Sequence, residues 1–223
     1  MKNIVVFTGA GISAESGLGT FRDSGGLWDN YKIEDVATPD AFKKNPELVL
    51  EFYNIRRRQL LSSSPNSAHY TLNKLQQNFN LQIITQNIDD LHERSGSNNV
   101  LHLHGKLRQS KSTLDNKLYE IEGSELILGD LCPNGAQLRP NVVWFGEAVP
   151  MMDVAIEIVK TADIFIIIGT SLNVYPAASL IHYTSNSCEK YIIDPNADDY
   201  QGINVIRKKA SESVPILVDQ LIS

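Results

Sequence analysis

Short apolar runs that end in turn residues recur along the chain, and helical patterns lie between several of them. Four of these runs predict strands, at residues 4–8, 81–85, 164–168 and 191–193. The last three are rich in isoleucine and do not alternate, which is typical of parallel strands covered on both faces. Helical patterns occupy residues 46–61, 67–77 and 151–161. This alternation predicts an α/β fold.

One segment, residues 110–135, does not follow this pattern. It is polar apart from a hydrophobic patch of six side chains: Leu118, Tyr119, Ile121, Leu126, Ile127 and Leu128. We therefore expect a small subdomain inserted into the main fold, with this patch holding it together.

Composition and charge exclude several classes of protein. The chain has 223 residues, 42% of them hydrophobic and 21% charged, which predicts one well-formed core. Its net charge of −6 argues against nucleic-acid binding through bulk charge. No apolar run approaches the roughly 20 residues that span a bilayer, and no signal peptide is evident. With only two cysteines as well, we expect a cytoplasmic protein without nucleic-acid or membrane partners. A monomer is plausible, but the sequence leaves the oligomeric state open.

A glycine turn follows the first predicted strand. Gly9, Gly11 and Ala14 fit the form G-x-G-x-x-G/A, in which glycines let the backbone approach a pyrophosphate at a helix N-terminus. An ordinary tight turn is the alternative interpretation. The chain then continues through a glycine-rich segment, 17–28, in place of the second strand and terminal acid of a dehydrogenase. A hydride-transferring enzyme is therefore disfavoured, and we expect a mobile loop in which Arg22 meets a phosphate or Phe21 a nicotinamide ring.

Amides, carboxylates and histidines follow the strand predicted at 81–85. Gln86, Asn87 and Asp89 come directly after it, where a doubly wound sheet binds its ligand. A histidine with an ordinary pKa near 6.5 is the natural general base at neutral pH. We favour His104 in this role because Gly105 beside it would leave room for a ligand, although a structural role stays open for any single histidine. A structural role is expected for the others: His69, His92, His102 and His182.

Five ordered motifs together resemble the sirtuins, the NAD-dependent protein lysine deacylases. They are G-A-G-I-S-A-E at 9–15 with T-F-R at 20–22, T-Q-N-I-D at 85–89, H-G at 104–105, V-W-F-G-E at 143–147 and G-T-S at 169–171. The resemblance implies a Rossmann-like, doubly wound parallel sheet and a single catalytic domain over 1–223. Its large part would comprise about 1–30, 65–105 and 140–223, with small-domain insertions at about 31–64 and 106–139. An acyl-lysine peptide would bind between the two parts.

The resemblance also implies roles for individual residues. His104 would be the general base, with Asn87 and Asp89 catalytic beside it, in a reaction that releases nicotinamide and O-acyl-ADP-ribose. The NAD pocket would comprise Gly9, Ala10, Gly11, Ser13, Glu15, Phe21, Arg22, Trp28, Gln86, Asn87, Asp89, Gly169, Thr170, Ser171, Asn196 and Ala210. The substrate backbone would pair with Val143, Trp144, Phe145 and Gly146 as an added strand.

The acyl group that is removed is suggested by the helix predicted at 46–61. Tyr53 and Arg56, three residues apart, share one helix face, and a solvated basic face is the plain interpretation. With Ala37 upstream, however, the pattern is similar to the sirtuins that remove acidic acyl groups. There the alanine widens the pocket while the tyrosine and arginine grip a carboxylate. We therefore expect succinyl-, malonyl- or glutaryl-lysine to be preferred over acetyl-lysine.

The sequence departs from the sirtuin pattern at the zinc site. Most sirtuins carry two cysteine pairs in the small domain, whereas here that interval holds Cys132 alone, and Cys188 lies far along the chain. We therefore expect no zinc or other metal, whereas the resemblance implies NAD as cofactor. Two alternatives remain: transfer of ADP-ribose to protein, and a module that binds NAD or ADP-ribose with little turnover.

Overall fold

The computed structural model describes residues 1–19, 30–170 and 172–223, and its centre is a six-stranded parallel sheet. The strand order is β3-β2-β1-β7-β8-β9. The strands are β1 (Asn3–Thr8), β2 (Asn80–Thr85), β3 (Val100–His102), β7 (Ile164–Ile168), β8 (Glu189–Ile193) and β9 (Asn204–Ile206). The α/β fold with a doubly wound parallel sheet is thus confirmed, and each of the four predicted strands is present.

Helices cover both faces of this sheet. One face packs against α1 (Gly11–Ala14), α5 (Ser67–Lys74) and α8 (Ala210–Ile222), which supply Ile12, Leu72 and Val214 to a single apolar core. The other face packs against α7 (Met152–Lys160) and the 3-10 helix η3 (Ala177–Tyr183). The helix predicted at 67–77 is divided into α5 and a 3-10 turn, η2 (Leu75–Gln77). Every residue of β7 is buried, as expected of a strand with helices on both sides.

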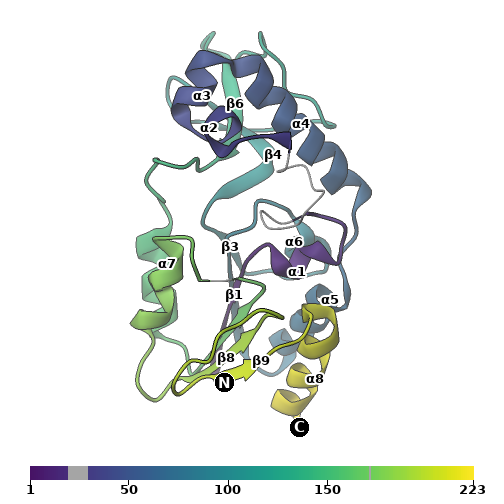
Figure 1. Ribbon diagram of the computed structural model, residues 1–223, viewed down its shortest axis with the longest axis vertical. Helices are drawn as coiled ribbons and strands as arrows, with labels where there is room; N and C mark the ends of the chain where they lie inside the picture. Colours follow the sequence, from purple (N-terminus) through teal and green to yellow (C-terminus); the bar gives the residue numbers. More distant parts are fainter. Residues whose placement is uncertain (20–29, 171) are drawn as a thin grey trace.

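A smaller unit contains three helices and an antiparallel sheet of order β5-β4-β6 (Figure 1). Its helices are α2 (Ile33–Val36), α3 (Pro39–Lys44) and α4 (Pro46–Ser62), and its strands β4 (Gly105–Ser112), β5 (Leu118–Glu120) and β6 (Leu138–Val142). Thr38 and Asn45 cap α3 and α4, each before a proline in the first turn, where its missing N–H costs nothing. Helix α6 (Leu91–Arg94) follows β2 at the junction with the large sheet.

The hydrophobic patch of the small subdomain does not hold it together as expected. Ile121 and Leu126 are buried against Leu50 of α4. Leu118 and Ile127, in contrast, are 53% and 56% exposed, and Leu128 is also exposed. The expectation was wrong because only part of the patch faces a helix.

Two buried polar side chains of α4 anchor this segment instead. The Arg57 side chain donates to the Leu107 carbonyl (2.9 Å) and to the Ser124 carbonyl (2.7 Å). The Asn54 amide accepts from the Leu126 N–H (3.0 Å) and donates to the Leu126 carbonyl (3.1 Å). Burial lowers the pKa of Arg57 to about 10. The loop at 124–126 is thus bound to α4 by hydrogen bonds to its backbone.

Within the described ranges, no helix is long and apolar enough to cross a bilayer.

Candidate active site

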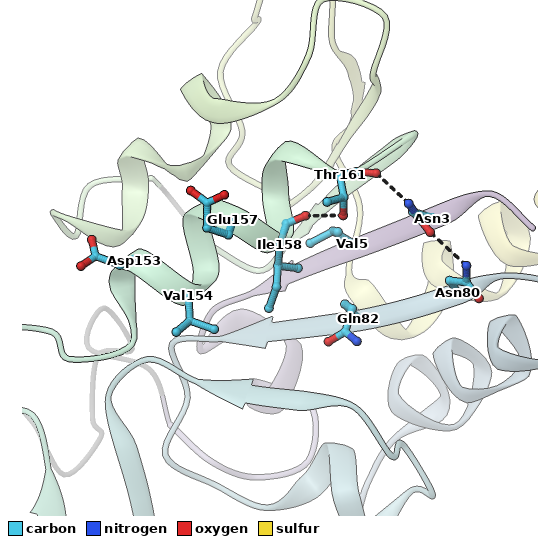
Figure 2. Close-up of a pocket in the computed structure, with 9 residues that line it drawn as sticks. All are labelled: Asn3, Val5, Asn80, Gln82, Asp153, Val154, Glu157, Ile158 and Thr161. Carbon is cyan, nitrogen blue, oxygen red and sulfur yellow. Dashed lines mark hydrogen bonds between the residues drawn. The ribbon is translucent and has the colours of Figure 1, made fainter.

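A cavity of about 660 Å³ lies between α7 and the first two strands of the large sheet (Figure 2). Asn3 and Asn80 line it, and they stand at the amino ends of β1 and β2. Ligands of doubly wound sheets bind at the opposite edge, beyond the carboxyl ends of the strands. None of the residues singled out from the sequence lines this cavity, so we locate the candidate site elsewhere.

The carboxyl edge of the sheet contains a topological switch point between β1 and β7. From β1 the chain proceeds to β2 and β3 on one side, whereas β7, β8 and β9 extend on the other. The turns after these two central strands interlock. Gly9 donates to the Ile168 carbonyl (3.0 Å), and Gly11 donates to the Gly169 carbonyl (2.9 Å). This is the crevice in which a doubly wound fold binds a dinucleotide.

The glycines are required here by contact between the two turns. A Cβ atom on Gly11 would lie 2.6 Å from the Gly169 Cα, and one on Gly9 would lie 2.7 Å from the Gly169 carbonyl oxygen. The structure therefore gives a reason that the motif alone did not, since these glycines let the β1 turn approach the β7 turn. The β1 and β7 turns therefore pack backbone against backbone at the carboxyl edge of the sheet.

Polar side chains from the β2 turn lie beside this crevice. The Gln86 amide donates to Thr170 Oγ1 (3.1 Å) and so connects the β2 turn to the β7 turn. The Asn87 amide donates to the Gly9 carbonyl and to Ser13 Oγ, both at 3.1 Å. Ser13 Oγ in turn donates to an Asp89 carboxylate oxygen (3.0 Å). The structure thus brings the predicted Asn87, Asp89 and Ser13 together in one network.

Asp89 is held by a second contact and is strongly buried. Its other carboxylate oxygen accepts from the Leu91 N–H at 3.2 Å. Burial raises the pKa of Asp89, while the bonds from Leu91 and Ser13 and the nearby His102 act against this rise. The bonds from Ser13 and Leu91 hold the Asp89 carboxyl group in one orientation.

His104 has the tautomer that a general base needs. Its Nδ1 lies 3.0 Å from the Gln86 carbonyl oxygen, which can only accept, so Nδ1 carries the hydrogen. In the neutral ring, Nε2 then carries the lone pair. Burial lowers the pKa of His104, and the bond to Gln86 acts against this. The ring is therefore neutral and able to take a proton at pH 7.

Gly105 does not leave room for a ligand as expected. Its φ is +84°, and a Cβ atom there would lie 2.0 Å from the carbonyl oxygen of Asn141. The glycine is needed because β6 crosses close to the backbone at this point. Gly105 therefore does not support His104 as the base, contrary to the expectation. The support comes instead from the tautomer that the Gln86 carbonyl selects.

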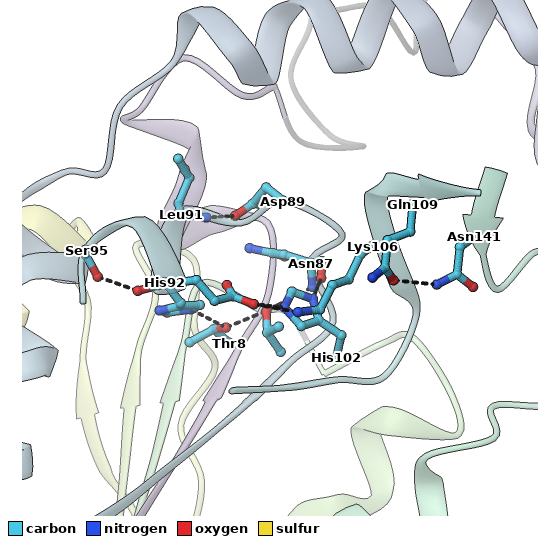
Figure 3. A network of polar contacts seen from close by, with 12 residues as sticks. Thr8, Asn87, Asp89, Leu91, His92, Ser95, His102, Lys106, Gln109 and Asn141 are labelled. Atoms are coloured by element: carbon cyan, nitrogen blue, oxygen red, sulfur yellow. Dashed lines mark hydrogen bonds and ion pairs between the residues drawn. The ribbon is translucent and has the colours of Figure 1, made fainter. Parts of the chain in front are cut away.

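Sequence reasoning missed a polar network behind Asn87 (Figure 3). His102 contacts the Asn87 carbonyl through Nδ1 (3.0 Å) and the Glu93 carboxylate through Nε2 (2.8 Å). Lys106 donates to the same Glu93 oxygen (2.9 Å). Hydrogen bonds from these two groups lower the pKa of Glu93 to about 2, although burial acts in the opposite direction. The only sequence signal for this network was the spacing H-x-H of His102 and His104. The two rings contact consecutive carbonyls of the β2 turn, those of Asn87 and Gln86.

His69 and His92 form a buried pair away from the candidate base. Their ring centres are 5.0 Å apart, and His92 Nε2 contacts Thr8 Oγ1 at 3.0 Å. Burial lowers the pKa of His69 to about 4 and that of His92 to about 3. These contacts agree with the structural role expected for both.

The residues expected near the adenosine lie along the other half of the carboxyl edge. Gly169, Asn196 and Ala210 follow β7, β8 and β9, which are neighbours in the sheet. Glu15 accepts from the Ser211 N–H (3.1 Å) in the first turn of α8. Four further expected residues lie outside the described residues: Phe21, Arg22, Trp28 and Ser171.

Residues expected to select the acyl group meet in one apolar cluster of the small unit. Ala37 and Tyr53, two of the three residues expected to select the acyl group, belong to this cluster, and so does Trp144, which was expected to face the substrate backbone; each is less than 5% exposed. The Trp144 indole N–H donates to the Tyr53 hydroxyl oxygen at 3.0 Å. Burial raises the pKa of Tyr53 to about 12, so the hydroxyl stays protonated at neutral pH.

Three consecutive arginines of α4 have different surroundings. Arg57 is fully buried, and Arg58 is exposed and paired with Glu51 and Glu125. Arg56 is partly buried, with its guanidinium carbon 5.9 Å from the centre of the Phe52 ring. Burial lowers the pKa of Arg56, and the oxygens of Tyr53 and Asp89 act against this. Arg56 stands three residues after Tyr53 on α4, so the two side chains share one face of the helix.

The segment expected to pair with the substrate backbone already uses several of its N–H groups. Val143 donates to the His104 carbonyl (2.9 Å), and Phe145 donates to the Ala37 carbonyl (3.0 Å). Trp144 donates to a Glu147 carboxylate oxygen (2.8 Å). Other backbone groups of this segment would therefore have to pair with a peptide. The bonds to His104 and Ala37 hold the segment between these two residues.

The two cysteines are separate, buried and unbridged. The structured ranges 1–19, 30–170 and 172–223 contain no group of three or more side chains suited to a metal ion. The absence of zinc stays a prediction.

Residues 9–176 match the model of the Sir2 family. The chain is 53% identical to an NAD-dependent protein deacylase of Bacteroides thetaiotaomicron, over 100% of this chain and 99% of that one. It is 50% identical to an NAD-dependent protein deacylase of Helicobacter pylori, over 100% and 96%. A solved structure of a Sir2 homologue in complex with NAD superposes with a TM-score of 0.90 at 41% identity, over 99% of this chain and 90% of that one.

Proposed function

The chain belongs to the Sir2 family of NAD-dependent protein deacylases, and we propose that it removes succinyl, malonyl or glutaryl groups from protein lysines in preference to acetyl groups. One observation supports this preference above the others. Of three consecutive arginines, Arg57 is bonded to backbone carbonyls and Arg58 is paired with two carboxylates, whereas Arg56 lies three residues after Tyr53 on one face of α4, and the oxygens of Tyr53 and Asp89 act to raise its pKa. A guanidinium beside a protonated hydroxyl suits a carboxylate, which accepts hydrogen bonds from both.

The cofactor would bind along the carboxyl edge of the large sheet. The backbone of Gly9 to Gly11 and Gly169 would face the pyrophosphate, and the β2 turn would face the ribose and nicotinamide. NAD supplies the ribose that accepts the acyl group and the nicotinamide that leaves. The residues of this chain would bind and orient these groups, with Asn87 and Asp89 fixed through Ser13.

His104 would move the proton in this reaction. With Nδ1–H bonded to the Gln86 carbonyl, Nε2 would be the atom available to take a proton from a ribose hydroxyl. The turn containing Gln86 also carries Asn87 and Asp89, so one short segment orients both the base and the groups around the ribose. Small displacements of this turn should therefore reduce the rate by large factors.

The acyl preference is tested by Arg56→Met, with Arg58→Met as the matched control. One peptide sequence carrying either succinyl- or acetyl-lysine is assayed, and kcat/KM is compared. We expect Arg56→Met to reduce desuccinylation about tenfold or more beyond its effect on deacetylation, since a hydrogen bond to a charged group contributes about 1.5–3 kcal/mol. Arg58→Met should leave the ratio unchanged, because Arg58 is exposed and bonded to Glu51 and Glu125. Equal loss on both peptides in Arg56→Met would contradict the proposal.

A further inference from the structure

A buried ion pair fixes the turn that carries Trp144. Arg139 donates from Nη1 to Glu147 Oε1 (2.7 Å) and from Nη2 to Glu147 Oε2 (3.1 Å). Glu147 Oε2 also accepts from the Trp144 N–H at 2.8 Å. Bidentate pairs of this kind have a defined geometry, so the carboxylate holds the Trp144 backbone in one position relative to β6.

The same arginine also fixes the Trp144 side chain. The Arg139 guanidinium carbon lies 3.3 Å from the centre of the indole ring, and Nη2 donates to the Val142 carbonyl (2.9 Å). Phe42 packs against the indole with ring centres 5.4 Å apart. Trp144 is therefore held by a cation, by a neighbouring ring and through its own backbone.

The contact between Trp144 and Tyr53 determines how the tyrosine uses its hydroxyl. An indole nitrogen can only donate, so the Tyr53 oxygen is the acceptor of the 3.0 Å bond. The hydroxyl hydrogen must then point elsewhere. Over the ranges with assigned structure, no acceptor for that hydrogen is bonded to Tyr53.

We propose that Trp144, held by the Arg139–Glu147 pair, is a positioning residue that directs the Tyr53 hydroxyl hydrogen toward the carboxylate of an acidic acyl group. This inference rests on the proposed function and adds residues that determine its selectivity. With Trp144 in place, Tyr53 meets a carboxylate as a preoriented donor beside Arg56. Without the indole N–H, the hydroxyl can rotate, and part of its donation to the acyl group is lost.

Two observations are consistent with this role. Burial raises the pKa of Tyr53 to about 12, so the hydrogen remains on the hydroxyl throughout the pH range of an assay. Glu147 is held as the charged partner, since hydrogen bonds from Arg139 and Trp144 lower its pKa although burial opposes them. Tyr53 therefore stays protonated and Glu147 stays charged near neutral pH.

A double-mutant cycle tests the proposal. Trp144→Phe, Tyr53→Phe and the double variant are assayed with succinyl and acetyl forms of one peptide, and the ratio of the two kcat/KM values is the readout. We expect Tyr53→Phe to lower this ratio about tenfold and Trp144→Phe to lower it severalfold, mainly through KM for the succinyl peptide. In the Tyr53→Phe background, Trp144→Phe should have no further effect on the ratio.

The outcomes separate this inference from the proposed function. If Arg56→Met is selective but the effects of Trp144→Phe and Tyr53→Phe on the ratio multiply independently, the orienting role is overturned and the acyl preference stands. If Arg56→Met and Tyr53→Phe both leave the ratio unchanged, the acyl preference fails, and this inference fails with it.

Glu147→Gln provides a second variant if Trp144→Phe does not fold. This variant keeps the Trp144 indole and removes only the Glu147 charge that holds it. In the wild-type background, the ratio of the two kcat/KM values should fall by a smaller factor than in Trp144→Phe. In the Tyr53→Phe background, the ratio should not change. An equal fall in both backgrounds would overturn the proposal.

Discussion

The two halves of the candidate site are fixed in different ways. At the carboxyl edge of the large sheet, the polar side chains are placed by strand order and bonded largely to nearby backbone, as with His104 to Gln86 and Asn87 to Gly9. In the small unit, charged side chains make the fixing contacts, as with Arg57 to the Leu107 carbonyl and Arg139 to the Glu147 carboxylate. The proposed cofactor side thus depends on strand order, whereas the proposed acyl side depends on contacts of individual charged side chains.

This difference predicts different responses to substitution. Changes on the cofactor side should affect the rate with little effect on folding, because two apolar layers hold the sheet. Changes among the buried arginines should affect folding or selectivity first.

The largest effect is expected from His104→Ala. Removing the base should lower kcat by at least about 10²-fold, the usual contribution of general acid–base catalysis. Nicotinamide release measures the rate, and thermal unfolding should show a nearly unchanged Tm. His182→Ala, a histidine on η3, is the control and should retain activity. Normal turnover in His104→Ala would remove His104 from the mechanism.

The next effect concerns stability, in Arg57→Met. The substitution leaves the Leu107 and Ser124 carbonyls without a buried donor, at about 1–3 kcal/mol each. A total of about 3 kcal/mol corresponds to a fall in Tm of roughly 6–12 °C for a chain of this size. Arg58→Met, at the next and exposed position, should change Tm little. Equal Tm values for the two variants would show that Arg57 does not anchor the subdomain.

A loss of stability of similar size is expected when the pH falls. In the fold His69 and His92 have pKa values of about 4 and about 3, against an ordinary value of 6.5. Below pH 6.5 the unfolded chain therefore binds more protons than the folded one, and stability falls by about 1.4 kcal/mol per pH unit for each histidine. Urea unfolding between pH 7.5 and 5 measures this. A constant free energy of unfolding over that range would contradict the neutral, buried pair.

No effect at all is expected from removal of metal. If Arg57 and Asn54 hold the small unit without zinc, a strong chelator should leave both Tm and activity unchanged. Elemental analysis of protein purified without chelator should find no stoichiometric zinc. One zinc per chain, or a large fall in Tm with chelator, would show that a metal site was overlooked.

The placement of residues at the carboxyl edge of the large sheet could be predicted from the sequence better than the contacts of the small unit, for physical reasons. Hydrophobic runs set the strands, and strand order brings the turns after β1, β2 and β7 together, so Gly9, Asn87 and Gly169 could be expected near one another. The role of Gly105 and the exposure of half the apolar patch depend on which backbone crosses where, which periodicity does not encode. The Arg139–Glu147 pair likewise depends on the turn between them, and the sequence pattern gave no indication that these two side chains meet.

The central claim is the preference for an acidic acyl group, and one assay tests it most directly. A single peptide sequence carrying acetyl-, succinyl-, malonyl- or glutaryl-lysine is incubated with the wild-type protein, with and without NAD, and followed by mass spectrometry. The account predicts that loss of the acidic groups requires NAD and proceeds with a higher kcat/KM than loss of acetyl. A preference for acetyl would contradict the roles given to Tyr53 and Arg56, and protein that gains ADP-ribose instead of losing an acyl group would contradict the deacylation itself.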